Sequence, residues 1–154
     1  MWLISPRCSA LTVAAAGVLL LAACSDGFSP QVIEETTFAS SLNVDLGLMT
    51  KTASGLYVKD FEEGIGEPAV LWDLVFVSYT GYLSNGTELE VDEFSFTLGI
   101  GLVVAGFDEG VLGMKAEGRR RIILPPSLGY EDLDTGTIPP GSILIYDLVL
   151  DSIN

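Results

Sequence analysis

The sequence predicts an antiparallel α+β domain over residues 55–154, and three observations lead to this prediction. Short runs rich in β-branched and aromatic residues alternate with glycine-containing turns. Only one stretch, 103–114, repeats its apolar residues at the three- and four-residue spacing of a helix. A loop with four prolines, 125–141, precedes the last strand. Strands that dominate around a single helix favour a sheet packed against that helix.

The first two predicted strands are 56–61 and 71–83, and the second has the strongest strand composition in the chain. The Asn-Gly pair within 84–87 predicts a tight hairpin with positive φ at both central residues. Asn85-Gly86-Thr87 also fits an N-glycosylation sequon, but the turn explains these residues better.

The remaining elements follow from the same reasoning. Residues 94–98 alternate apolar and polar side chains, as a half-buried strand does. The helix is predicted over 103–114, with Gly113 near its end. Further strands are predicted at 119–124 and 142–153.

The N-terminus has the pattern of a bacterial lipoprotein signal, predicted over residues 1–23. Arg7 precedes an apolar run that is too short for a typical membrane-spanning helix. This run ends in Leu21-Ala22-Ala23-Cys24, which resembles a lipobox, so Cys24 is the predicted lipidation site. An uncleaved anchor or an ordinary secretory signal that ends in cysteine are the alternatives. The prediction places the domain outside the cytoplasm, in the cell envelope, anchored to the membrane by lipid.

Residues 24–54 are predicted to be the lipidated N-terminus and a tether. The first half has no clear period apart from one helical turn at 32–38. In the second half, 42–48 alternates apolar and polar residues, which predicts a strand-like segment against the domain.

Composition excludes several kinds of chemistry. The chain has no histidine, and its two cysteines are Cys8 in the signal and Cys24, so the domain has no thiol for catalysis or disulfides. The formal net charge is -14, which disfavours nucleic acid as a partner. No metal or other cofactor is expected.

Four ordered blocks with matching spacing cover about residues 55–154 and are similar to FKBP-type prolyl cis/trans isomerases. They contain the tyrosine-bearing strand and hairpin, the central strand and helix, the next strand with the start of the long loop, and the end of that loop with the last strand. The blocks are 75–87, 94–114, 120–130 and 138–147.

The resemblance implies the family fold, a half-barrel of antiparallel β-sheet wrapped around one short helix. It also implies a catalytic set in which Phe107 forms the pocket floor and Tyr79 lines the pocket. In that set the Tyr130 hydroxyl and the Ile138 backbone N–H donate to substrate carbonyls. The implied substrate-binding residues are Leu89, Glu90, Phe94, Val103, Val104 and Tyr146.

The chain departs from the family pattern at one pocket wall. Residues 87–93 join the hairpin directly to the strand at Phe94, about five residues sooner than is usual in the family. Leu89 replaces an aromatic residue, and Glu90 stands where an aspartate is usual, with Asp92 as an alternative source of the carboxylate. Glu131 replaces a glycine after the loop tyrosine.

Three functional hypotheses follow. The first is a prolyl isomerase of reduced activity that acts on proline-containing polypeptides folding in the envelope; it needs no nucleophile or metal, because no bond is broken. The second is a non-catalytic binding module or chaperone, and the third is a structural lipoprotein without a ligand. Binding of a macrolide would favour the first, and the protein is expected to be a monomer.

Overall fold

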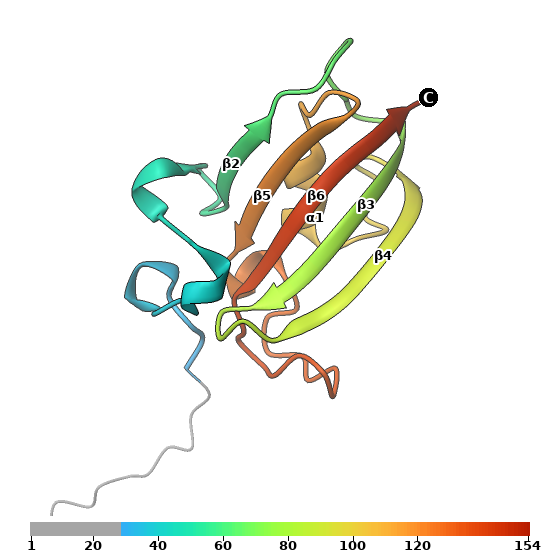
Figure 1. Cartoon of the computed structure of the whole chain (residues 1–154). Helices are drawn as coiled ribbons and strands as arrows, with labels where there is room; N and C mark the ends of the chain where they lie inside the picture. The colour runs from blue at the N-terminus through green and yellow to red at the C-terminus, as the bar shows by residue number, and fades with distance from the viewer. Residues whose placement is uncertain (1–28) are drawn as a thin grey trace, which may run out of the picture.

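The computed structural model describes residues 29–154 and shows one curved antiparallel sheet with a short helix in its hollow (Figure 1). The six strands lie in the order β1-β2-β5-β6-β3-β4. Their bounds are β1 Thr50–Lys51, β2 Tyr57–Glu62, β3 Leu74–Leu83, β4 Glu88–Thr97, β5 Gly118–Leu124 and β6 Leu144–Ile153. The single α-helix of this region is α1, Ala105–Val111. The predicted α+β fold, with an antiparallel sheet around one short helix, is confirmed.

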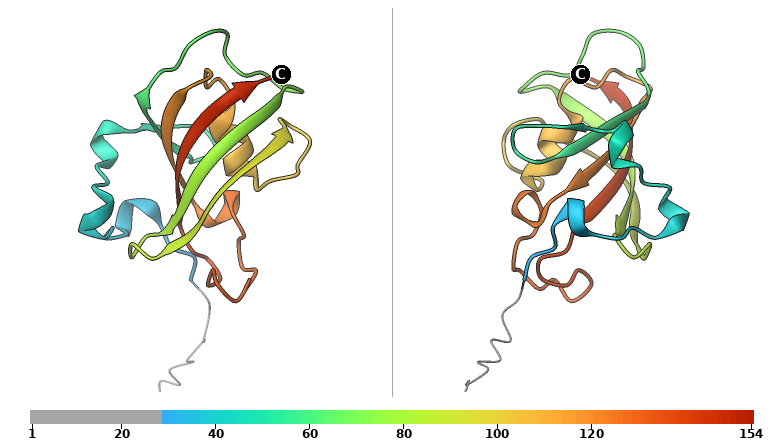
Figure 2. Two further views of the ribbon diagram at one scale, coloured as in Figure 1. Left: turned by 45° about the vertical axis from the view of Figure 1, so that its right-hand side comes forward. Right: turned by 90° about the vertical axis from the view of Figure 1, so that its left-hand side faces the viewer.

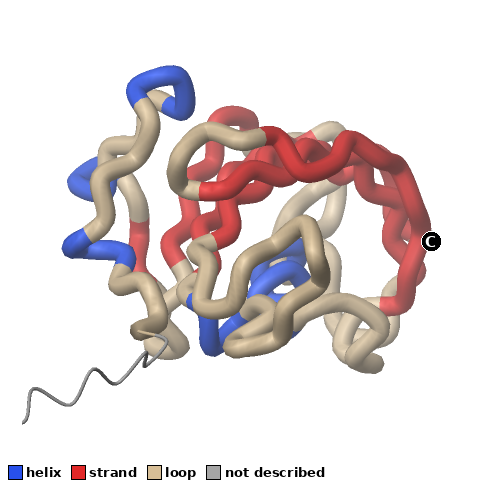
Figure 3. Tube along the Cα trace, turned by 90° about the horizontal axis from the view of Figure 1, so that it is seen from below, coloured by secondary structure: helices blue, strands red, loops and turns tan. Residues whose placement is uncertain are grey.

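The inner face of the sheet holds the main apolar core. Alternate residues of β3 and β6, such as Val75, Val77 and Leu148, are buried and point toward α1. Seen from below, the strands arch over the helix (Figure 3). A Cβ on Gly110 of α1 would come within 2.6 Å of Ile122 Cδ1 in β5, so glycine lets the helix lie close to the sheet.

A second apolar cluster lies on the outer face, against one end of the sheet. Ile123 and Ile145 from the strands pack with Ile33 and Leu42 from the N-terminal segment. We call residues 29–51 the N-terminal segment; Figure 2 shows it beside β2 and the lower ends of the strands. The described part of the predicted tether therefore packs on the domain. The predicted signal, 1–23, and Cys24 lie outside the described residues.

The N-terminal segment is also held by polar contacts. The Gln31 side-chain oxygen accepts from the Ile143 backbone N–H at 2.9 Å, and the Gln31 backbone N–H donates to the Gly141 carbonyl at 3.0 Å. The Arg121 guanidinium binds the Asp147 carboxylate through two nitrogens at 2.6 and 2.7 Å and also donates to the Leu42 carbonyl. These contacts fix the segment to the ends of β5 and β6.

The strand-like prediction for 42–48 is wrong. The N-terminal segment as a whole forms three short 3-10 turns, at Ile33–Glu35, Ser40–Leu42 and Leu46–Leu48. Asn43 has a left-handed backbone, φ 47°, and the Asp45 carboxylate accepts from the Gly47 N–H at 2.9 Å. Both features interrupt an extended chain. Of the predicted helical turn at 32–38, only Ile33–Glu35 is helical.

Other details of the predicted elements also differ from the structure. The helix is shorter than 103–114, because Val103 and Val104 approach it in non-helical backbone and Gly113 turns with φ 77°. The strand predicted from Leu71 begins at Leu74, after a turn in which Trp72 has φ 79°. In the hairpin only Gly86 has positive φ, because the Asn85 carboxamide accepts from the Thr87 N–H and forms a longer loop.

Candidate functional site

Four aromatic rings from four elements meet on the inner face of the sheet. Phe107 of α1 lies edge-on to Tyr79 of β3 and Tyr146 of β6, with ring centroids 5.4 and 5.2 Å away. Phe94 of β4 lies 5.8 Å from Phe107 and 5.6 Å from Tyr79. Edge-to-face packing of this kind stabilises aromatic clusters and fixes ring orientation. The predicted floor and wall residues are therefore together.

The rings border a cavity of about 360 Å³ that opens to solvent. Phe107 is only 4% exposed, as a floor residue should be. The cavity is lined by Tyr79, Glu90, Phe94, Leu102, Val103, Val104, Phe107, Tyr130 and Tyr146.

Tyr146 occupies its place because β3 has glycine opposite. Gly81 pairs with Tyr146 in the sheet, and a Cβ on Gly81 would lie 2.9 Å from Tyr146 Cε1. Any side chain at residue 81 would displace the ring from the cavity wall. The Tyr-Thr-Gly run of the strand thus supplies both a pocket residue and the space for another.

The hydroxyls of Tyr79 and Tyr146 stay protonated. Burial, followed by the neighbouring Glu90 carboxylate and then Asp92, raises the pKa of Tyr79 well above its ordinary value. Burial also raises the pKa of Tyr146, with smaller contributions from Tyr130 and Glu90. Both groups remain neutral hydrogen-bond donors throughout the physiological range.

The carboxylate at the altered wall is that of Glu90. β4 runs from Glu88 without a separate loop, and its register shifts once, between Gly81 and Tyr82 of the partner strand. Glu90 pairs with Gly81 and lines the cavity. Asp92 pairs with Tyr79, and its carboxylate accepts from the Glu93 N–H at 2.8 Å.

Leu89 lies at this irregularity and packs against the main core, outside the set that lines the cavity. It is half-buried, so its side chain supports the wall from behind. The wall facing the cavity is formed by Glu90 and Phe94. That wall has one aromatic side chain and one carboxylate.

The long loop 125–143 covers the other side of the cavity and brings Tyr130 to it. Ile138 is 9% exposed and packs into the core, and its backbone N–H donates to Thr135 Oγ1 at 3.0 Å. The N–H predicted to bind a substrate carbonyl is thus held by a side chain of its own loop. Glu131, at the position usually taken by glycine, has a left-handed backbone, φ 50°, the region that favours glycine.

One residue that lines the cavity was not predicted from the sequence. Leu102 borders the cavity and is 68% exposed. It directly precedes Val103 and Val104, which were predicted to line the pocket, but its apolar character alone gave no sign of its place at the rim.

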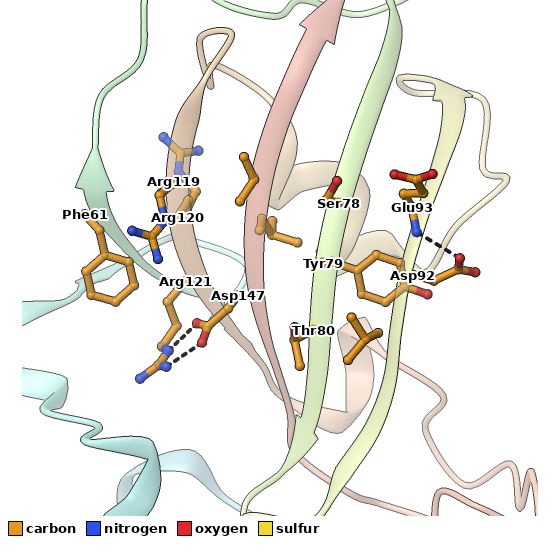
Figure 4. Close-up of a pocket in the computed structure, with 13 residues that line it drawn as sticks. Phe61, Ser78, Tyr79, Thr80, Asp92, Glu93, Arg119, Arg120, Arg121 and Asp147 are labelled. Atoms are coloured by element: carbon orange, nitrogen blue, oxygen red, sulfur yellow. Dashed lines mark hydrogen bonds and ion pairs between the residues drawn. The ribbon is translucent and has the colours of Figure 1, made fainter.

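A wider groove, of about 780 Å³, lies on the outer face of the same strands (Figure 4). Its sides are chemically mixed: Phe61, Arg119 and Arg121 lie toward β2 and β5, and Glu93 lies on β4. Arg121 is engaged by Asp147, and Arg119 by Glu62 at 3.1 Å. The arginines are paired with protein carboxylates, and of the aromatic cluster only Tyr79 borders this groove. We therefore assign the functional site to the inner cavity.

The domain is similar to known proteins. The family model described as FKBP-type peptidyl-prolyl cis-trans isomerase matches residues 66–151. The FK506-binding protein of Neisseria meningitidis serogroup B is 39% identical over 102 residues, which are 62% of this chain and 94% of that protein. FK506-binding protein 2 of Dictyostelium discoideum is 44% identical over 88 residues, 53% of this chain and 66% of that protein.

Solved structures show the same relationship. The crystal structure of AtFKBP13 superposes with a TM-score of 0.64 at 30% identity, covering 69% of this chain and 98% of that one. The crystal structure of FkpA from Escherichia coli gives 0.65 at 28% identity, covering 75% of this chain and 55% of that one. The inner cavity lies within the matched region, and the chain belongs to the family of FKBP-type peptidyl-prolyl cis-trans isomerases.

Proposed function

We propose that the protein accelerates rotation about Xaa–Pro bonds in polypeptides that fold in the bacterial cell envelope. The observation that carries this proposal is the cavity of about 360 Å³ around Phe107, bordered by four further aromatic rings. Uncatalysed rotation must cross a barrier of about 18–20 kcal/mol, because the planar peptide bond is stabilised by resonance. It is slow enough to limit folding.

The cavity suits the transition state better than the ground state. A peptide bond twisted through 90° loses its conjugation and becomes less polar, so a dry aromatic surface favours it. The hydroxyls of Tyr79 and Tyr130 supply donors around the cavity. The Ile138 N–H becomes a further donor when Thr135 Oγ1 gives way to a substrate carbonyl.

A protease-coupled isomerisation assay on Xaa-Pro tetrapeptides tests the activity. We expect a rate above the spontaneous one that is lost in Phe107→Ala and kept in Phe76→Ala, which alters an outward residue of β3. Correctly folded protein with no rate above background would refute the proposal. Titration with FK506 or rapamycin is a parallel measurement, and we expect binding at the same cavity.

One observation favours a second candidate, a non-catalytic peptide-binding module. The wall at β4 presents Glu90 and only one aromatic ring, while Leu89 lies behind it. This candidate predicts saturable binding of proline peptides, seen as NMR shifts of Tyr79 and Phe107, without any acceleration of their exchange.

We further propose that Cys24 carries lipid, which would anchor a monomeric domain to a membrane of the bacterial cell envelope, with the domain outside the cytoplasm. No helix within residues 29–154 is long and apolar enough to cross a membrane. The supporting observation is the Leu21-Ala22-Ala23-Cys24 sequence. Mass spectrometry of the membrane-extracted protein should show a diacylglyceryl group at Cys24, and Cys24→Ser should release the protein from membranes. Sedimentation of the detergent-free Cys24→Ser protein tests the monomeric state.

A further inference from the structure

A group of exposed apolar side chains leads away from the cavity. We call Leu71, Trp72, Ile100 and Leu102 the apolar track. Their exposed fractions are 55%, 74%, 45% and 68%. Single exposed apolar residues are normal on proteins, but a connected group beside a binding site indicates a contact surface.

The track is continuous with the cavity. Leu102 belongs to the cavity rim, and Ile100 lies two residues before it in the same turn. Leu71 packs over that turn: a Cβ on Gly99 would lie 2.6 Å from Leu71 Cδ2. The Trp72 N–H donates to the Leu98 carbonyl at 3.0 Å. The track thus extends from the rim of the cavity to the entrance of β3.

Trp72 is poorly suited to its backbone position. Its φ of 79° lies in the left-handed region, which favours glycine and is uncommon for bulky residues. The side chain is 74% exposed, so burial within the described domain offsets little of this strain. Glycine would relieve the backbone strain at this position, so folding does not explain the tryptophan. Tryptophan is common at binding surfaces, which points to contact with another molecule.

The loop that presents the track is held rigidly. The Asp73 carboxylate accepts from the Val70 N–H at 2.9 Å, and Ala69 exchanges backbone hydrogen bonds with Gly113 and Met114 at 2.9 and 2.7 Å. The Asp108 carboxylate accepts from the Gly99 N–H at 2.8 Å. A surface ordered in advance loses little conformational entropy when it binds.

We propose that the apolar track binds apolar side chains of the same client polypeptide whose proline occupies the cavity. This inference rests on the proposed isomerase function and deepens it by naming the substrate class. The preferred substrates are unfolded chains with aliphatic or aromatic residues near the proline, as the interior segments of folding proteins have. Continuity with the cavity identifies the occupant, because a chain leaving the cavity on this side meets the track.

A membrane surface fits the track less well. Gln31 is bound at the end of the sheet where β6 begins, whereas Trp72 lies near Asn154 at the other end, marked C in Figure 1. The two ends of the ten-residue strand β3 are about 30 Å apart. A lipid at Cys24 would therefore hold the opposite end toward the membrane. The net charge of -14 also disfavours anionic lipid and a second copy of the chain.

Kinetics on matched peptides test the proposal in the full chain. One substrate is a tetrapeptide with a single Xaa-Pro bond; two longer peptides carry the same bond flanked by leucine and phenylalanine or by serine. The double variant combines Trp72→Gly, which suits the backbone, with Ile100→Ser, which removes a second apolar contact. The matched control is Leu48→Ser, at an exposed leucine outside the apolar track. We expect the double variant to lose about tenfold in kcat/KM on the apolar peptide, as removal of one or two apolar contacts implies. Rates on the tetrapeptide and the serine peptide should change less than about twofold, a limit well below that loss.

Equal rates of wild type and double variant on the apolar peptide, or equal losses on all three peptides, would overturn the proposal.

A binding measurement tests the apolar track separately from the proposed isomerase activity. In the full chain with Trp2→Phe, Trp72 is the sole tryptophan, and its emission should shift with the apolar peptide and not with the serine peptide. That result supports the track even if no peptide is isomerised. A shift with phosphatidylglycerol vesicles alone, or Trp72-dependent dimers in sedimentation, would instead overturn it.

Discussion

The two faces of the sheet use the same strands for different purposes. On the inner face of β3, Tyr79 joins an aromatic cluster around a cavity. On the outer face, the partners of the strands are ion pairs such as Arg121 with Asp147 and the apolar N-terminal segment. Because successive side chains of a strand point to opposite faces, one run of residues supplies both. The comparison teaches that substitutions on the inner face should affect turnover, and those on the outer face stability alone.

The largest expected effect belongs to the inner face. Phe107→Ala should abolish measurable isomerisation and lower the free energy of unfolding by about 3–5 kcal/mol, because it leaves a cavity in the core. Urea unfolding and the peptide assay measure the two effects on one sample. Phe107→Leu, which keeps most of the volume, should recover much of the stability. Full activity in Phe107→Ala would show that the cavity is not the site.

The next effect belongs to the outer face. Leu42 is 5% exposed in the cluster formed with Ile123 and Ile145. Leu42→Ala should lower the free energy of unfolding by about 2–3 kcal/mol, in the lower part of the range for buried leucines. The tetrapeptide rate of the folded protein should stay unchanged at a temperature well below the transition. A fall in that rate would break the separation of the two faces.

A smaller effect tests the loop donor. Tyr130→Phe removes the hydroxyl and keeps the ring that lines the cavity. Loss of one hydrogen bond of about 0.5–1.5 kcal/mol in the transition state predicts a fall in kcat of about two- to tenfold. Thermal unfolding should be unchanged, and Tyr82→Phe, on the outer cluster, is the control that should leave kcat at the wild-type value.

The smallest effect depends on pH and concerns the N-terminal segment. Hydrogen bonds from Lys51 and from Tyr57, the latter at 2.8 Å, lower the pKa of Glu34 from 4.5 to about 2. A lowered pKa in the folded state contributes stability above pH 4.5, and that contribution is lost as the pH falls from 4.5 toward 2. Amide protection factors at residues 31–51, which divide out the intrinsic pH dependence of exchange, should therefore fall over this range. Glu34→Gln should have lower protection factors already at neutral pH, and these should no longer change between pH 4.5 and 2.

The fold was largely predictable because its elements are encoded locally. The strands around Val75–Leu83 and 119–124 have β-branched and aromatic residues between clear turns. The aromatic members of the site, Tyr79, Phe94, Phe107 and Tyr146, lie together as the family resemblance implied.

The rest depends on contacts between distant residues. The packing of Leu42 against Ile123 and Ile145 has no local signature, since alternation in 42–48 suits a strand as well as a chain of 3-10 turns. The length of β4 also escaped prediction, because Glu88–Glu93 is rich in carboxylates and gains its strand geometry from pairing with β3. Likewise, the engagement of the Ile138 N–H by Thr135 depends on how the loop closes.

The carboxylates of β4 have a consequence for the protein in crowded solution. β4 is an edge strand of the sheet. It pairs with β3 on one side only, so the backbone groups along its other side are unpaired within the sheet. Exposed strand edges are templates for pairing with other chains, which leads to aggregates. Glu88, Glu90, Asp92 and Glu93 lie along this edge, and a second β4 placed beside it would bring two such acidic rows together. Glu90, which lines the cavity, and the neighbouring acidic residues of β4 thus disfavour edge-to-edge assembly.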